Sequence, residues 1–170
     1  IPANGSRCGS GSVTLSATPV NGNTINWYSA PTGRTSFLTT GLSYTTPSLT
    51  ATTTYYITTL NSSTGAESSP RTAITATVNA VVGNPSSPVG ASRCGSGAVT
   101  LSATVGSNGN TLRWYANSSG GSVLHTGTSY SPSVSATTTF HVSSFNSTTQ
   151  CESGRIAVTA TVNPLPTAPT

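Results

Sequence analysis

Apolar and polar residues alternate along most of this chain in short runs. In the first run, Val13, Leu15 and Ala17 alternate with Thr and Ser. Further runs with the same period of two lie at 25–28, 55–58 and 72–78. A period of two predicts half-buried β-strands, and the Gly, Pro and Asn residues between the runs predict turns. We therefore expect an all-β protein.

The whole series of runs occurs twice. The motif RCGSG lies at 7–11 and again at 93–97, and VTLSAT lies at 13–18 and again at 99–104. Both copies close on TATVN, at 75–79 and 159–163. About seven short strands in each copy predict an antiparallel β-sandwich of the immunoglobulin type. We expect two tandem immunoglobulin-like domains, residues 1–80 and 81–170, with Trp27 and Trp114 at the centre of their cores.

The connection between the copies is rich in proline. The linker 80–92 contains Pro85 and Pro88, and the tail 164–170 contains three more prolines. Such connections are semi-rigid, and residues 86–91 are also expected to form the first edge strand of the second domain. Thirteen residues separate Asn79 from Arg93, and the seven residues after Asn163 plus the six before Arg7 also make thirteen. This match predicts that 170 residues are one period of a longer head-to-tail array.

The composition indicates an exposed extracellular surface. Only 5% of the residues are charged, Ser and Thr make up 62 of 170, and Lys, Asp and Met are absent. The net charge of +4 comes from six scattered Arg residues, without the basic cluster that nucleic acids require. No apolar run approaches the length of a membrane span. We expect no nucleic-acid partner and no membrane insertion, and we expect any sorting signal to lie outside this segment.

Catalytic chemistry is not expected. A chain without Asp cannot form a Ser-His-Asp triad or a carboxylate-rich calcium site. Glu67 and Glu152 are the only acids, and they lie in different copies, whereas general acid–base catalysis needs neighbouring groups. His125 and His141 occur only in the second copy and are interpreted as surface variation. We predict that the protein is not an enzyme and has no cofactor and no metal site.

The three cysteines suggest a crosslink. Cys94 and Cys151 lie in the second copy, whereas the first copy has Cys8 at the position of Cys94 and Ala66 at that of Cys151. We predict a disulfide between Cys94 and Cys151, worth about 4 kcal/mol on the chain-entropy model; the alternative is two buried thiols. Cys8 is predicted to be an unpaired thiol, the alternative being a crosslink to a neighbouring chain.

The two acids and their neighbours suggest structural ion pairs. Each Glu follows the second position of the expected crosslink, and an Arg precedes the first. The expected pairs are Arg7 with Glu67 and Arg93 with Glu152, and the competing partners are Arg71 and Arg155.

Together these motifs resemble a known family. The order RCGxG, VTLSA, WY, YTTPSLTATTTYY, CES and VTATVN resembles the immunoglobulin-like repeats of large secreted and surface proteins of Bacteroidetes, adhesins among them. The resemblance covers both copies nearly end to end. It implies a β-sandwich, an extracellular location and a pairing of the cysteines in RCG and CES; Cys94 and Cys151 fill both positions, and Ala66 departs from the pattern.

These observations leave three functional hypotheses. The first is a structural repeat of an extracellular filament or adhesin stalk, whose partners are further copies of itself. The second is a module that binds surface glycans through exposed Tyr28, Tyr115 or Tyr56. The third is an accessory domain of an enzyme, which would need a catalytic partner outside this chain.

Overall fold

A computed structural model describes residues 1–20 and 23–167. The last three residues of the predicted tail, 168–170, lie outside the described part. The chain divides into two compact units, Ile1–Ala80 and Val81–Thr170, and each is described by itself. No helix among the described residues is long and apolar enough to cross a membrane.

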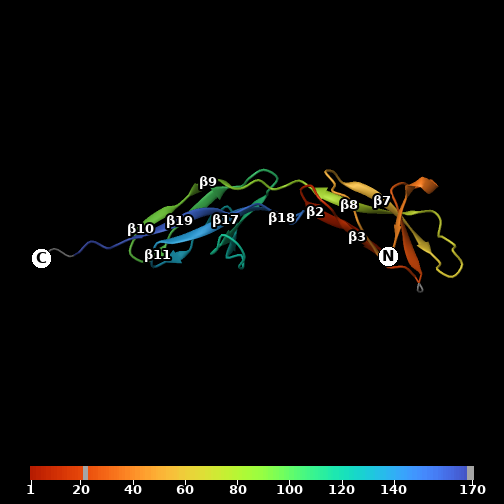
Figure 1. Cartoon of the computed structure of the whole chain (residues 1–170). Coiled ribbons are helices and arrows are strands. Elements are labelled where there is room, and N and C mark those ends of the chain that lie inside the picture. The colour runs from red at the N-terminus through yellow and green to blue at the C-terminus, as the bar shows by residue number, and fades with distance from the viewer. Residues whose placement is uncertain (21–22, 168–170) are drawn as a thin grey trace. The chain divides into compact units, whose positions relative to one another are not determined.

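The first unit consists of short strands and one 3₁₀ turn (Figure 1). Its elements are β1 (Pro2–Ala3), β2 (Gly5–Cys8), β3 (Thr14–Ala17), β4 (Thr24–Tyr28), η1 (Arg34–Ser36), β5 (Phe37–Thr40), β6 (Ser43–Thr45), β7 (Thr53–Leu60) and β8 (Thr72–Asn79). One sheet has the order β2-β8-β7-β4-β5 and the other β1-β3-β6. The predicted all-β sandwich is confirmed.

The second unit repeats this plan. Its elements are β9 (Ser86–Val89), β10 (Ala91–Cys94), β11 (Gly97–Ala98), β12 (Leu101–Thr104), β13 (Thr111–Tyr115), β14 (His125–Thr126), β15 (Ser129–Tyr130), β16 (Ser133–Val134), β17 (Thr138–Asn146), β18 (Cys151–Glu152) and β19 (Ile156–Asn163). One sheet has the order β10-β19-β17-β13-β14, with β18 paired to β17. The remaining strands form the sheet β15-β12-β9 and the pair β11-β16. Because β9 pairs with β12, the first edge strand expected at 86–91 is confirmed over Ser86–Val89, whereas Ala91 already belongs to β10 in the other sheet.

One strand of each unit runs parallel to its neighbour. β2 lies parallel to β8 with Cys8 opposite Asn79, and β10 lies parallel to β19 with Cys94 opposite Asn163. Local alternation of apolar and polar residues does not predict either parallel strand. The chain passes from β1 in one sheet to β2 in the other at Asn4, whose side-chain oxygen accepts the backbone N–H of Thr75 at 2.9 Å.

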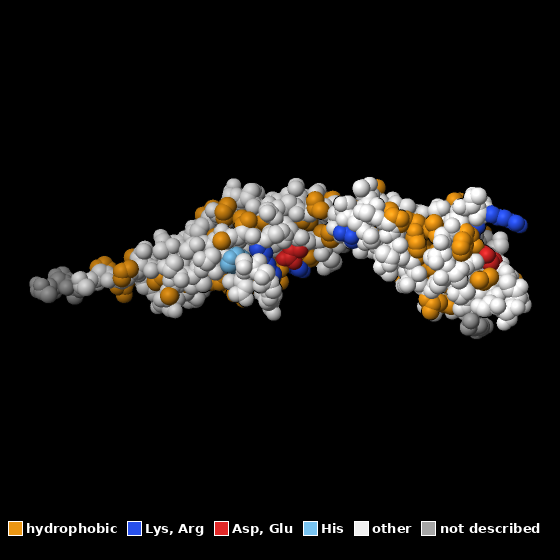
Figure 2. Space-filling model, viewed as in Figure 1, with side chains coloured by type: hydrophobic (Ala, Val, Ile, Leu, Met, Phe, Trp, Pro, Cys, Tyr) orange, Lys and Arg blue, Asp and Glu red, His pale blue; other side chains and the backbone are white. Residues whose placement is uncertain are grey.

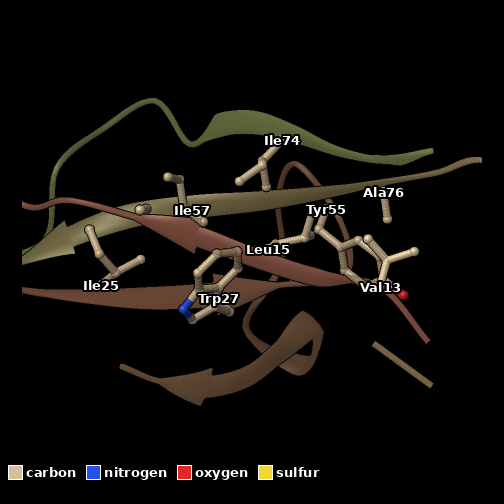
Figure 3. Close-up of a cluster of buried hydrophobic side chains, with 9 residues drawn as sticks. Val13, Leu15, Ile25, Trp27, Tyr55, Ile57, Ile74 and Ala76 are labelled. Atoms are coloured by element: carbon tan, nitrogen blue, oxygen red, sulfur yellow. The ribbon is translucent and has the colours of Figure 1, made fainter. Parts of the chain in front are cut away.

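The core of each unit lies between its sheets and follows the alternation. Trp27 and Trp114 are fully buried, as predicted, and their indole N–H groups donate to the carbonyls of Gly41 and Gly127 at 2.7 and 2.9 Å. Burying a large aromatic ring with its one polar atom bonded is how such a residue stabilises a core. Figure 3 shows the cluster in the first unit, which consists of Val13, Leu15, Ala17, Ile25, Trp27, Tyr55, Ile57, Ile74 and Ala76.

The chain enters and leaves each unit at opposite ends. In the first unit the backbone at Ile1 is bonded to Thr18, after β3, whereas Asn79 lies beside Cys8. In the second unit Ser86 faces Thr104, whereas Asn163 lies beside Cys94. We call these the leading end and the trailing end of a unit. In Figure 1 the C-terminal segment leaves the second unit at its trailing end.

Candidate functional site

The trailing end of each unit is an arginine-braced turn. Arg7 donates from Nε to the carbonyl of Gly9 and from Nη1 to that of Ser12, both at 3.0 Å. Arg93 does the same to Gly95 and Ala98, both at 3.1 Å. Each arginine therefore holds one backbone carbonyl inside the RCGSG motif and one just after it.

The predicted ion pairs Arg7–Glu67 and Arg93–Glu152 are wrong. Arg7 is opposite Val78 at the trailing end, whereas Glu67 pairs with Leu60 near the leading end. At about 3.3 Å per residue, these positions are more than about 20 Å apart along the strands. In the described part of the chain, a salt bridge joins Arg113 to Glu152, between Nη1 and Oε2 at 3.0 Å.

The predicted disulfide Cys94–Cys151 is also wrong. Cys94 is a free and exposed cysteine, whereas Cys8 and Cys151 are the disulfide-bonded ones, so the expectation of an unpaired Cys8 fails as well. The register explains the error: Cys94 is level with Asn163 at the trailing end, and Cys151 is opposite Asn146 at the leading end. Some ten residues of strand, roughly 30 Å, separate them, whereas a disulfide needs Cα atoms within about 7 Å.

Glu67 is the centre of a hydrogen-bonded cluster on the first unit. Its carboxylate accepts from Asn26 Nδ2 at 2.8 Å, from the Tyr28 hydroxyl and from Thr58 Oγ1 at 2.7 Å. Arg71 lies over the Tyr28 ring, with Cζ 3.4 Å from the ring centroid. The cluster fastens the loop before β8 to strands β4 and β7.

Glu152 has the same place in the second unit. Its carboxylate accepts from the hydroxyls of Tyr115 and Ser143 and from Arg113. Arg155 lies over the Tyr115 ring at 3.3 Å, as Arg71 does over Tyr28. No local sequence motif predicts this cluster, because its members come from strands that are far apart in sequence.

Both carboxylates are held ionised. The hydrogen bond from Tyr28 is the largest influence on Glu67 and lowers its pKa below 4.5; burial opposes it, and Thr58, Asn26 and Arg71 add to it. Burial is the largest influence on Glu152 and raises its pKa, but the hydrogen bonds from Ser143, Tyr115 and Arg113 outweigh it, and the pKa is lowered.

Two of the tyrosines proposed for glycan binding are not exposed. Tyr28 and Tyr115 are 4% and 3% exposed, because their rings lie beneath an Arg and their hydroxyls face a Glu. Tyr56 is half-buried. His125 is exposed and stacks on Tyr130 with centroids 5.4 Å apart, as surface variation would allow.

The cluster of the first unit is open to solvent on one side. A depression of about 500 Å³ is lined by Asn26, Tyr28, Arg34, Phe37, Glu67 and Arg71. The position of Asn26 is taken in the second unit by Arg113, which bonds Glu152 and lies over the Phe145 ring at 3.2 Å. A short amide in place of a long guanidinium leaves this space in the first unit.

A second pocket, of about 140 Å³, opens at the leading end of the first unit. Ile25 and Ile57 form part of its lining, and Ile1 and Val20 lie at its rim with 90% and 65% of their surfaces exposed. Among residues 1–20 and 23–167, no group of three or more His, Cys, Asp or Glu could hold a metal ion.

Comparisons with known proteins agree with this fold. The family model described as "Ig-like domain CHU_C associated" matches twice, over residues 1–79 and 84–164. The fibronectin(III)-like modules of Clostridium thermocellum CbhA are similar in structure, with 14% identity over 95% of this chain and 90% of that chain and a TM-score of 0.61. Chicken CNTN1 FN1–FN3 domains follow with 14% identity, 94% and 66% coverage and a TM-score of 0.53.

At such low identity the solved structures establish the fold alone, and no curated protein matches the sequence. The family model, in contrast, extends over nearly all of both units. The chain therefore belongs to the family of CHU_C-associated Ig-like domains and carries two copies of that domain.

Proposed function

We propose that this chain is a repeat unit of an extracellular filament or long adhesin stalk, assembled head to tail. The observation that carries the proposal is the placement of the two ends of each unit. The chain enters beside Thr18 or Thr104 and leaves beside Cys8 or Cys94, at the other end of the strands. A unit with this polarity extends an array by its own length each time it is repeated.

The surface supports the same proposal. On the face seen in Figure 2, most of the surface is neither hydrophobic nor charged, and charged side chains form small separate groups. Such a surface is wetted by hydroxyl groups and gives little charge repulsion between neighbouring units. The disulfide-bonded state of Cys8 and Cys151 supports an extracellular location, since disulfides persist in oxidising compartments.

Electron microscopy of native material tests the proposal. Protein taken from the producing cells without denaturation should appear as filaments or stalks with a regular repeat along their length. Two-unit particles of uniform size, unattached to anything longer, would contradict it. As a calibrated comparison, recombinant chains carrying one, two and four copies should increase in maximum dimension in small-angle scattering in proportion to copy number.

A second function, glycan binding, is favoured by the depression around Glu67. Phe37 is 49% exposed there and lies edge-on to Tyr28 at 5.8 Å, next to Arg34 and Asn26. An exposed ring beside amide, carboxylate and guanidinium groups suits a sugar. On a glycan array, binding that is lost in Phe37→Ala and kept in Leu124→Ala would support glycan binding. If the chain binds no glycan on the array, this second function is contradicted.

A further inference from the structure

The segment before β9 lies against the leading end of the second unit. Gly83 donates its backbone N–H to the carbonyl of Ser107 at 2.9 Å, and Asn108 Nδ2 donates to the carbonyl of Val81 at 2.8 Å. A Cβ at Gly106 would lie 2.2 Å from the Gly83 oxygen, so the two backbones are in close contact. Residues 81–84 are therefore bound to the loop between β12 and β13.

A second loop of the same end also meets this segment. A Cβ at Gly154 would lie 3.1 Å from Asn84 Oδ1. Val82 and Pro85 are both buried. The leading end of the second unit is thus covered by an extended segment with two buried apolar residues.

The corresponding end of the first unit has a pocket. The 140 Å³ pocket there is bordered by the loop after β3, at Thr18 and Val20, and by the loop before β8, at Ser68. These are the counterparts of the two loops that hold residues 81–84 in the second unit. At about 140 Å³, the pocket is close in size to an engineered cavity of ~150 Å³ that binds benzene, so it has room for a small apolar side chain.

We propose that this pocket seats the tail segment 164–169 of a preceding copy of the chain. The sequence of the tail fits: aligned through TATVN, Pro169 corresponds to Pro85 and Pro166 to the buried Val82. Pro2 then follows Pro169 at the same spacing at which Pro88 follows Pro85. A proline-rich segment is already extended, so seating it costs little conformational entropy. The proposal rests on the head-to-tail function and names the contact by which one repeat docks on the next.

The test attaches the sequence PLPTAPT directly before Ile1 of the full chain. The control carries the same seven residues with Gly in place of the prolines that correspond to Pro166 and Pro169. The terminal ammonium is then moved away from Ile1 equally in both extended proteins. The chain has five isoleucines, which serve as methyl NMR probes. Ile1, Ile25 and Ile57 line the pocket, Ile74 lies in the same core without lining it, and Ile156 lies in the second unit.

Compared with the control, the protein with the attached tail should show shifted methyl signals for Ile1, Ile25 and Ile57. The signals of Ile74 and Ile156 should be the same in both proteins. Followed through the Ile74 signal, the thermal midpoint of the first unit should rise by about 4 °C or more. Identical spectra and midpoints for tail and control would overturn the proposal. If the spectra are identical but native material forms filaments, only the docking contact is contradicted. If the tail is seated but native material forms no filaments, the proposed function is contradicted.

Discussion

Arginine side chains hold backbone carbonyls in both units. Arg71 donates to the carbonyls of Ala30 and Gly33, and Arg155 donates to those of Asn117 and Gly120, while each also lies flat on a tyrosine. A planar guanidinium with five donors can stack and bond at once, whereas an ammonium cannot. Lysine at position 71 or 155 could not make both kinds of contact.

The carboxylate of Glu152 should make the second unit sensitive to acid. Because its folded-state pKa is lowered, the ionised form stabilises the fold above about pH 4.5, and this contribution is lost as pH falls through the folded pKa. We expect Glu152→Gln to be destabilised at neutral pH and to lose less further stability in acid than the native chain. Urea unfolding at about pH 7 and about pH 3 measures both. Parallel acid curves for the two proteins would contradict the assignment.

The three cysteines should differ in reactivity. Cys94 is a free exposed thiol, and Cys8 and Cys151 are disulfide-bonded. Iodoacetamide added without reductant should modify Cys94 alone, because a disulfide sulfur is not alkylated. After reduction under denaturing conditions, all three should react. Peptide mass spectrometry locates the label, with Cys94→Ser as the unlabelled control; label on Cys8 or Cys151 before reduction would refute the assignment.

The braced turn after β2 or β10 shows how one element constrains another. β10 runs parallel to β19, and the chain must then turn back to reach β12. Gly97, which begins β11 directly after the turn, has a φ of 144°, a conformation that L side chains rarely adopt. A Cβ at this residue would lie 1.9 Å from Arg93 Nη1, so the arginine brace and the glycine depend on each other.

Gly97→Ala should therefore destabilise the second unit by about 1–3 kcal/mol, because it combines backbone strain with loss of the Arg93 bonds. Gly127→Ala is the matched control. Gly127 lies in the same unit with nearly the same φ, of 145°, but its Cβ would come no closer than 3.2 Å, to the exposed side chain of His125. Thermal unfolding should place Gly97→Ala below Gly127→Ala. Equal midpoints would show that the brace adds nothing to the strain.

At the scale of the whole chain, the two units have separate cores. One cluster surrounds Trp27 and the other surrounds Trp114, and their members come from residues 13–76 and 99–160 respectively. A repeat protein with this organisation is stabilised unit by unit, so damage stays local.

Leu101→Ala should destabilise the second unit by about 2–5 kcal/mol, since Leu101 is fully buried and its removal leaves a cavity. The first unit should keep its midpoint. Methyl signals of Ile156 and Ile74 report the two units separately during a thermal ramp. The converse variant, Leu15→Ala, should lower the Ile74 midpoint and leave that of Ile156. A common shift of both signals in either variant would contradict separate cores.

The sequence alone determined the fold class, the division into two repeats and the central Trp residues. A period of two decides which side chains of a strand face the core. This period can be read from residues that are close in sequence, such as Val13 and Leu15. The tertiary structure decided which distant residues share an end of a unit. Local alternation carries no information on strand direction or on register between strands far apart in sequence. The parallel pairing of β10 with β19 thus separates Cys94 from Cys151, and Arg93 from Glu152, by the length of the sandwich.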